Sequence, residues 1–316
     1  MKESRRRFMK GTGLIAGSLL SAPLASVASA QSSSGANVPS QSAGARLRKL
    51  IESSAPVQCP VVHDVISAKL SASHGFPAVL AGGGAISQDQ FGMGDYGMLT
   101  ITEMIELTTR IADSVDVPII ADGDDGGGNP LNVIRAVRML ERAGAACVLI
   151  EDLYGAKHLG AMGNGNVLAT DAMVDKIHAA TDARRDGGFM ILARCDAPKA
   201  EAYDRVAAYA QAGADIIMVG AIPAQEGPKV VQLTKRPLLS TQIAPVPELK
   251  QNMVSVAVYS GPLLNASVAA MDRVLASIKS TGLPGTSATI DRELLARVID
   301  RDTSVAAAKK YNALRR

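Results

Sequence analysis

The stretch Arg142-Ala-Gly-Ala-Ala-Cys-Val-Leu-Ile150 decides the fold class, because a helical window stops at a glycine and an apolar run follows at once. The same pattern returns at Gln211-Ala-Gly-Ala-Asp-Ile-Ile-Met-Val219. Apolar runs without polar alternation are typical of strands that are buried on both faces, as in parallel sheets covered by helices. The two stretches therefore predict repeated strand–helix units.

Such units continue along the chain from residue 46 onward. Strands are predicted near 58–62, 77–81, 117–121, 146–150, 189–195, 215–219, 237–240 and 255–259. Helices are predicted at 46–53, 65–73, 101–114, 131–143, 171–185, 199–212 and 263–279. Eight strand–helix units predict a (β/α)₈ TIM barrel with an N-terminal leading helix, and an open doubly wound sheet is the alternative.

Residues 1–30 have the features of an export signal. Ser4-Arg-Arg-Arg-Phe-Met-Lys10 resembles a twin-arginine motif, and an uncharged stretch leads from it to the small-residue pattern Ala28-Ser-Ala30. An ordinary secretory signal or an uncleaved anchor is the alternative. We expect a periplasmic protein without a stable membrane anchor after signal cleavage.

The export signal also carries the basic excess of the chain. The whole chain has a net charge of +3, and residues 1–30 hold five basic and one acidic side chain, so the remainder is close to −1. This balance argues against nucleic acid as a partner. Three cysteines are too few for a disulfide framework. After the signal we expect a flexible leader over 31–45, a catalytic barrel over 46–285 and a C-terminal helical extension over 286–316.

Acidic side chains follow two consecutive predicted strands. Asp122 and Asp124 end the third strand ahead of a glycine triplet, and Glu151 ends the fourth. Catalytic groups of a barrel collect where strands end, and hard cations prefer carboxylate oxygens. These three residues therefore predict a site for Mg²⁺ or Mn²⁺, bound directly or through waters. Arg194 ends the fifth strand, where it can bind a carboxylate or phosphonate, or pair with Asp196 or Glu151.

Two glycine-rich segments lie at the same end of the predicted barrel. Gly82, Gly83 and Gly84 follow the second strand and could offer backbone amides to an anionic substrate. The segment 155–165 is too rich in glycine for a helix and is predicted to be a lid. On it, Lys157 would supply a positive charge and His158 a proton.

These motifs in order resemble the isocitrate lyase/phosphoenolpyruvate mutase superfamily. The matching segments are His63-Asp64-Val-Ile-Ser67-Ala68, Gly94-Asp95-Tyr-Gly97, Pro118-Ile-Ile-Ala-Asp-Gly-Asp-Asp-Gly-Gly-Gly-Asn129, Ile150-Glu151-Asp152 with Lys157, and Ala193-Arg-Cys-Asp-Ala197. The resemblance implies a barrel, a Mg²⁺ ion, small carboxylate substrates, and helix-swapped homodimers or homotetramers.

The resemblance also assigns roles to individual residues. It implies that Asp122, Asp124 and Glu151 hold the metal, with Asp95 and Lys157 beside it. It further implies that the Gly83 amide and Arg194 hold the substrate. Several positions depart from the family pattern. Leu159 replaces the cysteine acid of the lyases, Gly220 replaces a glutamate and Asp125 replaces a threonine. Leu80 and Gly82 stand where the family has a tyrosine and a serine.

The intact metal residues and the altered proton-transfer residues together suggest a reaction class. We expect Mg²⁺-dependent cleavage of a C–C bond in a small 2-oxo or 2-hydroxy carboxylate, by decarboxylation as for oxaloacetate or by a retro-aldol step. One alternative is P–C bond chemistry of the phosphonopyruvate mutase or hydrolase type. A second is a periplasmic protein that binds carboxylates without catalysis.

Overall fold

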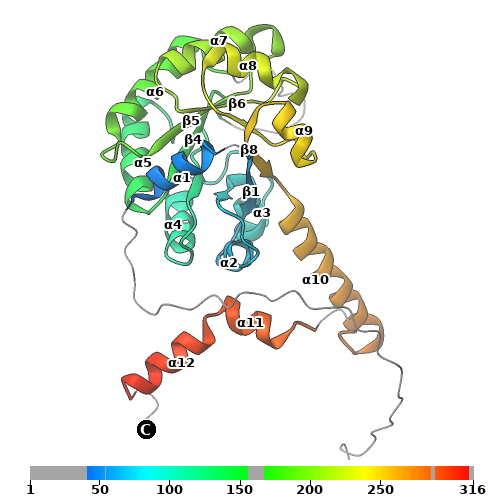
Figure 1. Cartoon of the computed structure of the whole chain (residues 1–316). Coiled ribbons are helices and arrows are strands. Elements are labelled where there is room, and N and C mark those ends of the chain that lie inside the picture. The colour runs from blue at the N-terminus through cyan, green and yellow to red at the C-terminus, as the bar shows by residue number, and fades with distance from the viewer. Residues whose placement is uncertain (1–40, 54, 156–166, 286–288, 313–316) are drawn as a thin grey trace, which may run out of the picture. The chain divides into compact units, whose positions relative to one another are not determined.

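The computed structural model describes residues 41–53, 55–155, 167–285 and 289–312. Eight parallel strands pair in chain order and close into a barrel, with the last strand on the first (Figure 1). The strands are β1 (Val57–Val62), β2 (Val79–Ala81), β3 (Ile119–Asp122), β4 (Cys147–Glu151), β5 (Met190–Cys195), β6 (Ile216–Val219), β7 (Leu238–Ser240) and β8 (Val254–Tyr259). The predicted (β/α)₈ barrel is confirmed, and the open sheet is excluded.

Helices lie between the strands and after the last one. They are α1 (Ala43–Ile51), α2 (Val65–Ser73), α3 (Gly83–Phe91), α4 (Ile101–Ala112), α5 (Pro130–Arg142), α6 (Thr170–Ala183), α7 (Lys199–Gln211), η1 (Ala224–Glu226), α8 (Gly227–Thr234), α9 (Val246–Gln251), α10 (Pro262–Thr281), α11 (Arg292–Val298) and α12 (Arg301–Lys310). The leading helix starts earlier than predicted, within the expected flexible leader, because the Ser42 hydroxyl accepts a hydrogen bond from the Ala45 amide.

Alternate residues of each strand face opposite sides of the barrel wall. Ile120, Leu149 and Leu192 belong to the core inside the barrel, where Leu47 of α1 joins them. Residues one position away, such as Ile150 and Ala193, pack against the surrounding helices instead. This alternation determines which polar side chains at the strand ends point inward.

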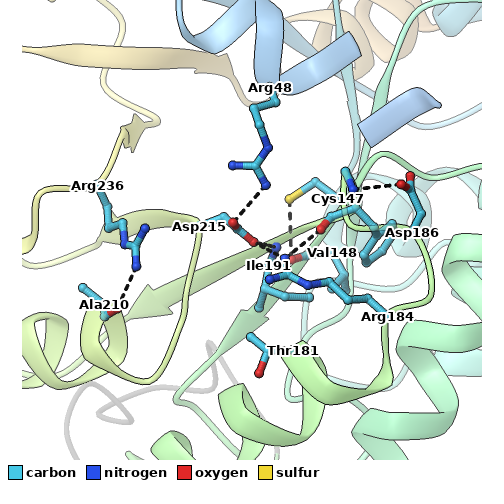
Figure 2. A network of polar contacts seen from close by, with 12 residues as sticks. Arg48, Cys147, Val148, Thr181, Arg184, Asp186, Ile191, Ala210, Asp215 and Arg236 are labelled. Atoms are coloured by element: carbon cyan, nitrogen blue, oxygen red, sulfur yellow. Dashed lines mark hydrogen bonds and ion pairs between the residues drawn. The ribbon is translucent and has the colours of Figure 1, made fainter. Parts of the chain in front are cut away.

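A charged network joins α1 to the amino-terminal end of the barrel (Figure 2). The carboxylate of Asp215, just before β6, accepts hydrogen bonds from Arg48 of α1 at 3.0 Å, from Arg184 at 2.6 Å and from the Ile191 amide at 2.9 Å. Because this carboxylate is largely buried, its three donors hold the leading helix against the strands.

Helix α10 follows β8 and has 20 residues, of which only Leu264 is buried. Val268, Met271, Leu275 and Ile278 are 53%, 55%, 65% and 45% exposed. Their spacing places them on one face of the helix, so α10 carries an apolar stripe that nothing in the described chain covers. In the described part of the chain, no helix combines the length and apolar character needed to cross a membrane.

Candidate functional site

The inward-facing series of three neighbouring strands ends in charged residues at the carboxyl end of the barrel. Asp122, Glu151 and Arg194 each come two positions after an interior core residue of β3, β4 or β5. Glu151 and Arg194 are register partners across β4 and β5, and their side chains form an ion pair at 3.3 Å. The structure thus brings together three of the residues that the sequence singled out.

Hydrogen bonds from two backbone amides fix the Asp122 carboxylate. Asp122 accepts from the Gly83 amide through Oδ2 at 3.0 Å and from the Asp124 amide through Oδ1 at 3.1 Å. Asp124 has a left-handed backbone with φ of 47°, and its carbonyl accepts from the Glu151 amide at 2.8 Å. The turn after β3 is therefore tied to the start of α3 and to β4.

The glycine triplet lets the backbone approach these carboxylates closely. Gly83 and Gly84 form the first turn of α3 rather than a loop, with Gly82 as the N-cap. A Cβ at Gly83 would lie 3.2 Å from Asp122 Oδ2 and 3.6 Å from Asp124 Oδ1, so both carboxylates converge on one point. The Asp95 carboxylate lies against Gly84 in the same way, at 2.8 Å from such a Cβ.

The donor set suits a hard cation that keeps part of its water shell. Among residues outside the gaps at 156–166 and at the ends, no three His, Cys, Asp or Glu side chains are grouped closely enough to bind a metal ion by themselves. Mg²⁺ typically retains several waters and takes only one or two carboxylates. The oxygens of Asp122 and Asp124 beside Gly83 fit that mode of binding.

Arg194 is held in place by two acidic partners. Its Nε lies 2.7 Å from Asp196 Oδ2, and its Nη2 donates to Asp196 Oδ1 at 2.9 Å, which gives a two-pronged contact. Both ion pairs that the sequence left open, with Asp196 and with Glu151, are present. Burial opposes the charge, but these two carboxylates outweigh it and raise the pKa of the Arg194 guanidinium. A charged, oriented guanidinium therefore stands at the rim.

A buried lysine, which was not predicted as a site residue, contacts the turn after β3. Lys176 of α6 donates from Nζ to the Asp125 carbonyl at 2.7 Å and lies 3.9 Å from the Asp125 carboxylate. Burial lowers the pKa of Lys176, although the charges of Asp125 and Glu151 oppose this. The sequence contained a signal, because Lys176 shares the apolar helix face of Met173 and Ile177.

A cavity of about 370 Å³ opens beside the carboxylates. Its lining includes the acidic residues Asp124 and Glu151 and the larger side chains of Leu99, Met104 and Tyr154. Tyr154 was not predicted as a site residue, and it is 46% exposed. Lys157, His158 and Leu159, on the predicted lid, lie outside the described residues.

The chain is similar to known proteins in both sequence and fold. Residues 47–279 match the family described as phosphoenolpyruvate phosphomutase. The chain belongs to this family. Its superfamily contains isocitrate lyase-type enzymes as well as mutases, so the resemblance found in the sequence is confirmed, and the chain is a member of a superfamily of carbon–carbon lyases and mutases.

Two curated relatives and one solved structure illustrate the range of the superfamily. The chain is 35% identical to 2-methylisocitrate lyase of Aeropyrum pernix over 77% of its own length and 82% of the relative. It is 39% identical to 2,3-dimethylmalate lyase of Eubacterium barkeri over 60% of its length and 67% of the relative. A phosphonopyruvate hydrolase in complex with oxalate and Mg²⁺ superposes with a TM-score of 0.76 at 25% identity, covering 86% of this chain and 99% of that one.

Proposed function

We propose that this member of the family is a Mg²⁺-dependent lyase, with Mn²⁺ as a possible substitute, that cleaves a C–C bond in a small 2-oxo or 2-hydroxy carboxylate. The observation that carries the proposal is the convergence of Asp122 and Asp124 on one point beside Gly83, while Arg194 is oriented on the same rim. Relatives named for lyase activity on methylisocitrate and dimethylmalate support the reaction class.

The side chains divide the work between binding and charge stabilisation. Asp122, Asp124 and Glu151 would hold the cation, in part through waters. The bound cation would supply positive charge to the enolate oxygen that develops when the C–C bond breaks. Arg194 would bind the substrate carboxylate. The Gly83 amide, which the resemblance assigned to the substrate, donates to Asp122 in this structure and so helps to orient a metal ligand instead.

The assignment of Arg194 as a substrate ligand requires a change of partners. In the described structure its guanidinium contacts Asp196 and Glu151, so a substrate carboxylate would share or replace the contact with Glu151. The fork with Asp196 can persist, because a guanidinium carries five donors. The site would be completed by Asp95, which lies beside Gly84, and by Lys157 and His158 of the predicted lid. These residues would carry out the proton transfer that the reaction requires.

A panel of acids tests this function directly. The purified protein would be assayed with Mg²⁺, and after removal of metal by a chelator, on oxaloacetate, 2-methylisocitrate, 2,3-dimethylmalate and related acids. Product pairs are quantified by NMR so that carbon balances. We expect Mg²⁺-dependent cleavage of one acid, and the absence of turnover for all of them would refute the lyase proposal.

The same panel separates the alternatives. Phosphonopyruvate is included because the chain superposes on a phosphonopyruvate hydrolase, and phosphorus NMR would detect cleavage or rearrangement of the P–C bond. Binding of oxalate with Mg²⁺ in a calorimeter, combined with no turnover, would instead support a carboxylate-binding protein.

We also propose that two or more copies of the chain exchange α10, as helix-swapped homodimers or homotetramers. The apolar stripe of α10 needs a covering surface, and a groove of about 560 Å³ lies between α2 and the start of α10. Ile66, Leu70 and Phe76 are among the apolar side chains that line it. The stripe of a second copy matches this groove in chemical character.

For the location in the cell we propose export to the periplasm by the twin-arginine route. The support is the Ser4–Lys10 motif and the small-residue pattern that ends at Ala30. Replacement of Arg5 and Arg6 by lysine should keep the full-length precursor in the cytoplasm. Cell fractionation followed by N-terminal sequencing checks this, and a variant that is still exported and processed would contradict the route.

A further inference from the structure

A buried carboxylate lies directly behind the rim, on the opposite side of the barrel wall from Glu151. Asp152 is 0% exposed and faces the helix layer, the side on which Val148 and Ile150 pack. Its Oδ2 accepts from the Tyr209 hydroxyl of α7 at 2.8 Å and lies 3.8 Å from Nη1 of Arg205. A polar network thus occupies a position that the strand otherwise fills with apolar side chains.

The network is connected to Arg194 through the backbone. The second oxygen of Asp152, Oδ1, accepts from the Asp196 amide at 2.8 Å, and the Asp152 amide donates to the Arg194 carbonyl at 3.1 Å. Since the Asp196 side chain holds the Arg194 guanidinium by two contacts, the orientation of Asp152 affects where that guanidinium points.

The same residues hold both described ends of the connection between β4 and α6. The Asp152 carbonyl accepts from the Leu168 amide at 2.8 Å, and Arg205 Nη1 donates to the Leu168 carbonyl at 2.7 Å. Between them, Leu153 and Val167 form an antiparallel bridge. Helix α7 therefore fixes the spacing of the two strand-like ends that flank the rim.

We propose that Asp152, held by Tyr209 and Arg205, is a positioning residue that orients the Arg194–Asp196 pair for substrate binding and fixes the ends of the β4–α6 connection. The proposal rests on the proposed function, because it assumes that Arg194 binds the substrate carboxylate.

The burial of the Asp152 carboxylate indicates a role beyond packing. Burial disfavours the charged form of a carboxylate, and the hydrogen bonds that Asp152 accepts from Asp196 and Tyr209 partly offset this cost. Such a group costs stability compared with an apolar side chain of similar size. The carboxylate instead fixes the relative position of two segments, because it accepts from the Asp196 amide just after β5 and from the Tyr209 hydroxyl of α7. The benefit should therefore appear in ligand binding more than in the stability of the fold.

A pair of matched tyrosine variants on α7 tests this. Tyr209→Phe removes only the hydroxyl that donates to Asp152, whereas Tyr203→Phe removes a hydroxyl on the same helix that contacts Glu226 and not Asp152. Calorimetry with oxalate in the presence of Mg²⁺ should show about a tenfold loss of affinity for Tyr209→Phe, about 1.4 kcal/mol. The Tyr203→Phe control should stay within about twofold of wild type.

Hydrogen exchange gives a second readout that does not depend on ligand binding. In Tyr209→Phe, amides of peptides covering 193–197 and 167–169 should exchange about tenfold faster than in Tyr203→Phe, because the Asp196 amide donates to Asp152. Equal exchange and equal oxalate affinity in the two variants would overturn the proposal.

Asp152→Asn extends the series. The side-chain amide keeps one acceptor oxygen and replaces the other by an NH₂ donor, so it cannot offer an oxygen at both positions that accept from the Asp196 amide and the Tyr209 hydroxyl. It also removes the negative charge near Arg205, which keeps its ion pair with Glu201. Its loss of oxalate affinity should exceed that of Tyr209→Phe. If wild type itself does not bind oxalate with Mg²⁺, the exchange rates of the tyrosine variants still decide the positioning role, and turnover of the panel of acids separately decides the proposed function.

Discussion

At the scale of single residues, the site depends on Gly83, because this residue has no side chain to keep the carboxylates away. Gly83 lets Asp122 and Asp124 approach the start of α3, and its own amide binds Asp122. The Asp122 carboxylate is thereby held by two backbone amides, which cannot rotate away as side chains do. Small changes of volume at this one position should therefore act on the metal site and leave the barrel intact.

Gly83→Ala tests the close approach. The added methyl group would lie 3.2 Å from Asp122 Oδ2, so that carboxylate must shift, whereas alanine is well tolerated in the first turn of a helix. We expect Mg²⁺ affinity, measured by calorimetry, to fall about tenfold, with the free energy of unfolding changed by less than about 1 kcal/mol.

Gly187→Ala is the matched control, because nothing lies within 4 Å of a Cβ at that position. It should leave Mg²⁺ affinity unchanged. An equal affinity in both glycine variants would show that the approach at Gly83 does not shape the metal site.

At the scale of elements, helix α4 begins with a capping box next to the cavity. Glu103 accepts from the Thr100 amide at 2.8 Å and hydroxyl at 2.7 Å, and the Glu103 amide donates to the Thr100 hydroxyl at 3.3 Å. The hydrogen bonds from Thr100 lower the pKa of Glu103. Since the folded-state pKa lies below the unfolded one, the charged box stabilises the fold above the unfolded pKa and loses this effect as pH falls through the folded pKa.

Glu103→Gln should therefore lower the free energy of unfolding at pH 7, with a difference from wild type that shrinks as the pH drops below about 4. Urea denaturation at several pH values measures this. Glu106→Gln on the same helix, whose carboxylate contacts Arg110, serves as control. A difference that stays constant from neutral to acidic pH would contradict the role of the charge.

The junction between α1 and the barrel depends on Asp215. Asp215→Asn should lower the free energy of unfolding by about 3 kcal/mol, because it leaves the charges of Arg48 and Arg184 without a partner. Arg48→Met should cost only about 1 kcal/mol, since the Arg48 side chain is 38% exposed and Asp215 keeps its other donors. Urea unfolding of the two variants compares them, and equal costs would argue against Asp215 as the centre of the junction.

At the scale of the whole molecule, the uncovered stripe of α10 predicts self-association. Leu275→Glu places a charge in the middle of this stripe, where the side chain is 65% exposed in the single chain. We expect the assembly to weaken at least about tenfold, so that light scattering after size-exclusion chromatography reports monomer.

Arg273→Glu on the other side of α10 is the control and should leave the assembly intact. A wild-type protein that is monomeric at micromolar concentration would contradict the exchange of α10 altogether.

The sequence predicted much of this architecture for reasons that can be stated. All eight strands were located because each is mainly apolar, even where a polar residue such as Gln58 of β1 or Ser255 of β8 interrupts the run. Helix α3 was not predicted, because a glycine triplet has low helix propensity. Helices α8 and α9 were missed as well, because they span only 8 and 6 residues and offer little periodicity. Lys176 and the Tyr209–Asp152 contact join residues 51 and 57 positions apart, which no local pattern reveals.

The sequence alone determined the barrel and the end at which its carboxylates gather. Inward-facing residues recur at every second position of a buried strand, and this period continues into the residues that follow the strand. Only the tertiary structure decided that Asp122 and Asp124 converge beside Gly83 and that Asp152 faces α7. These arrangements depend on the pairing of separate strands and on the left-handed turn at Asp124. Contacts between distant segments set both, so they appear only when the barrel closes.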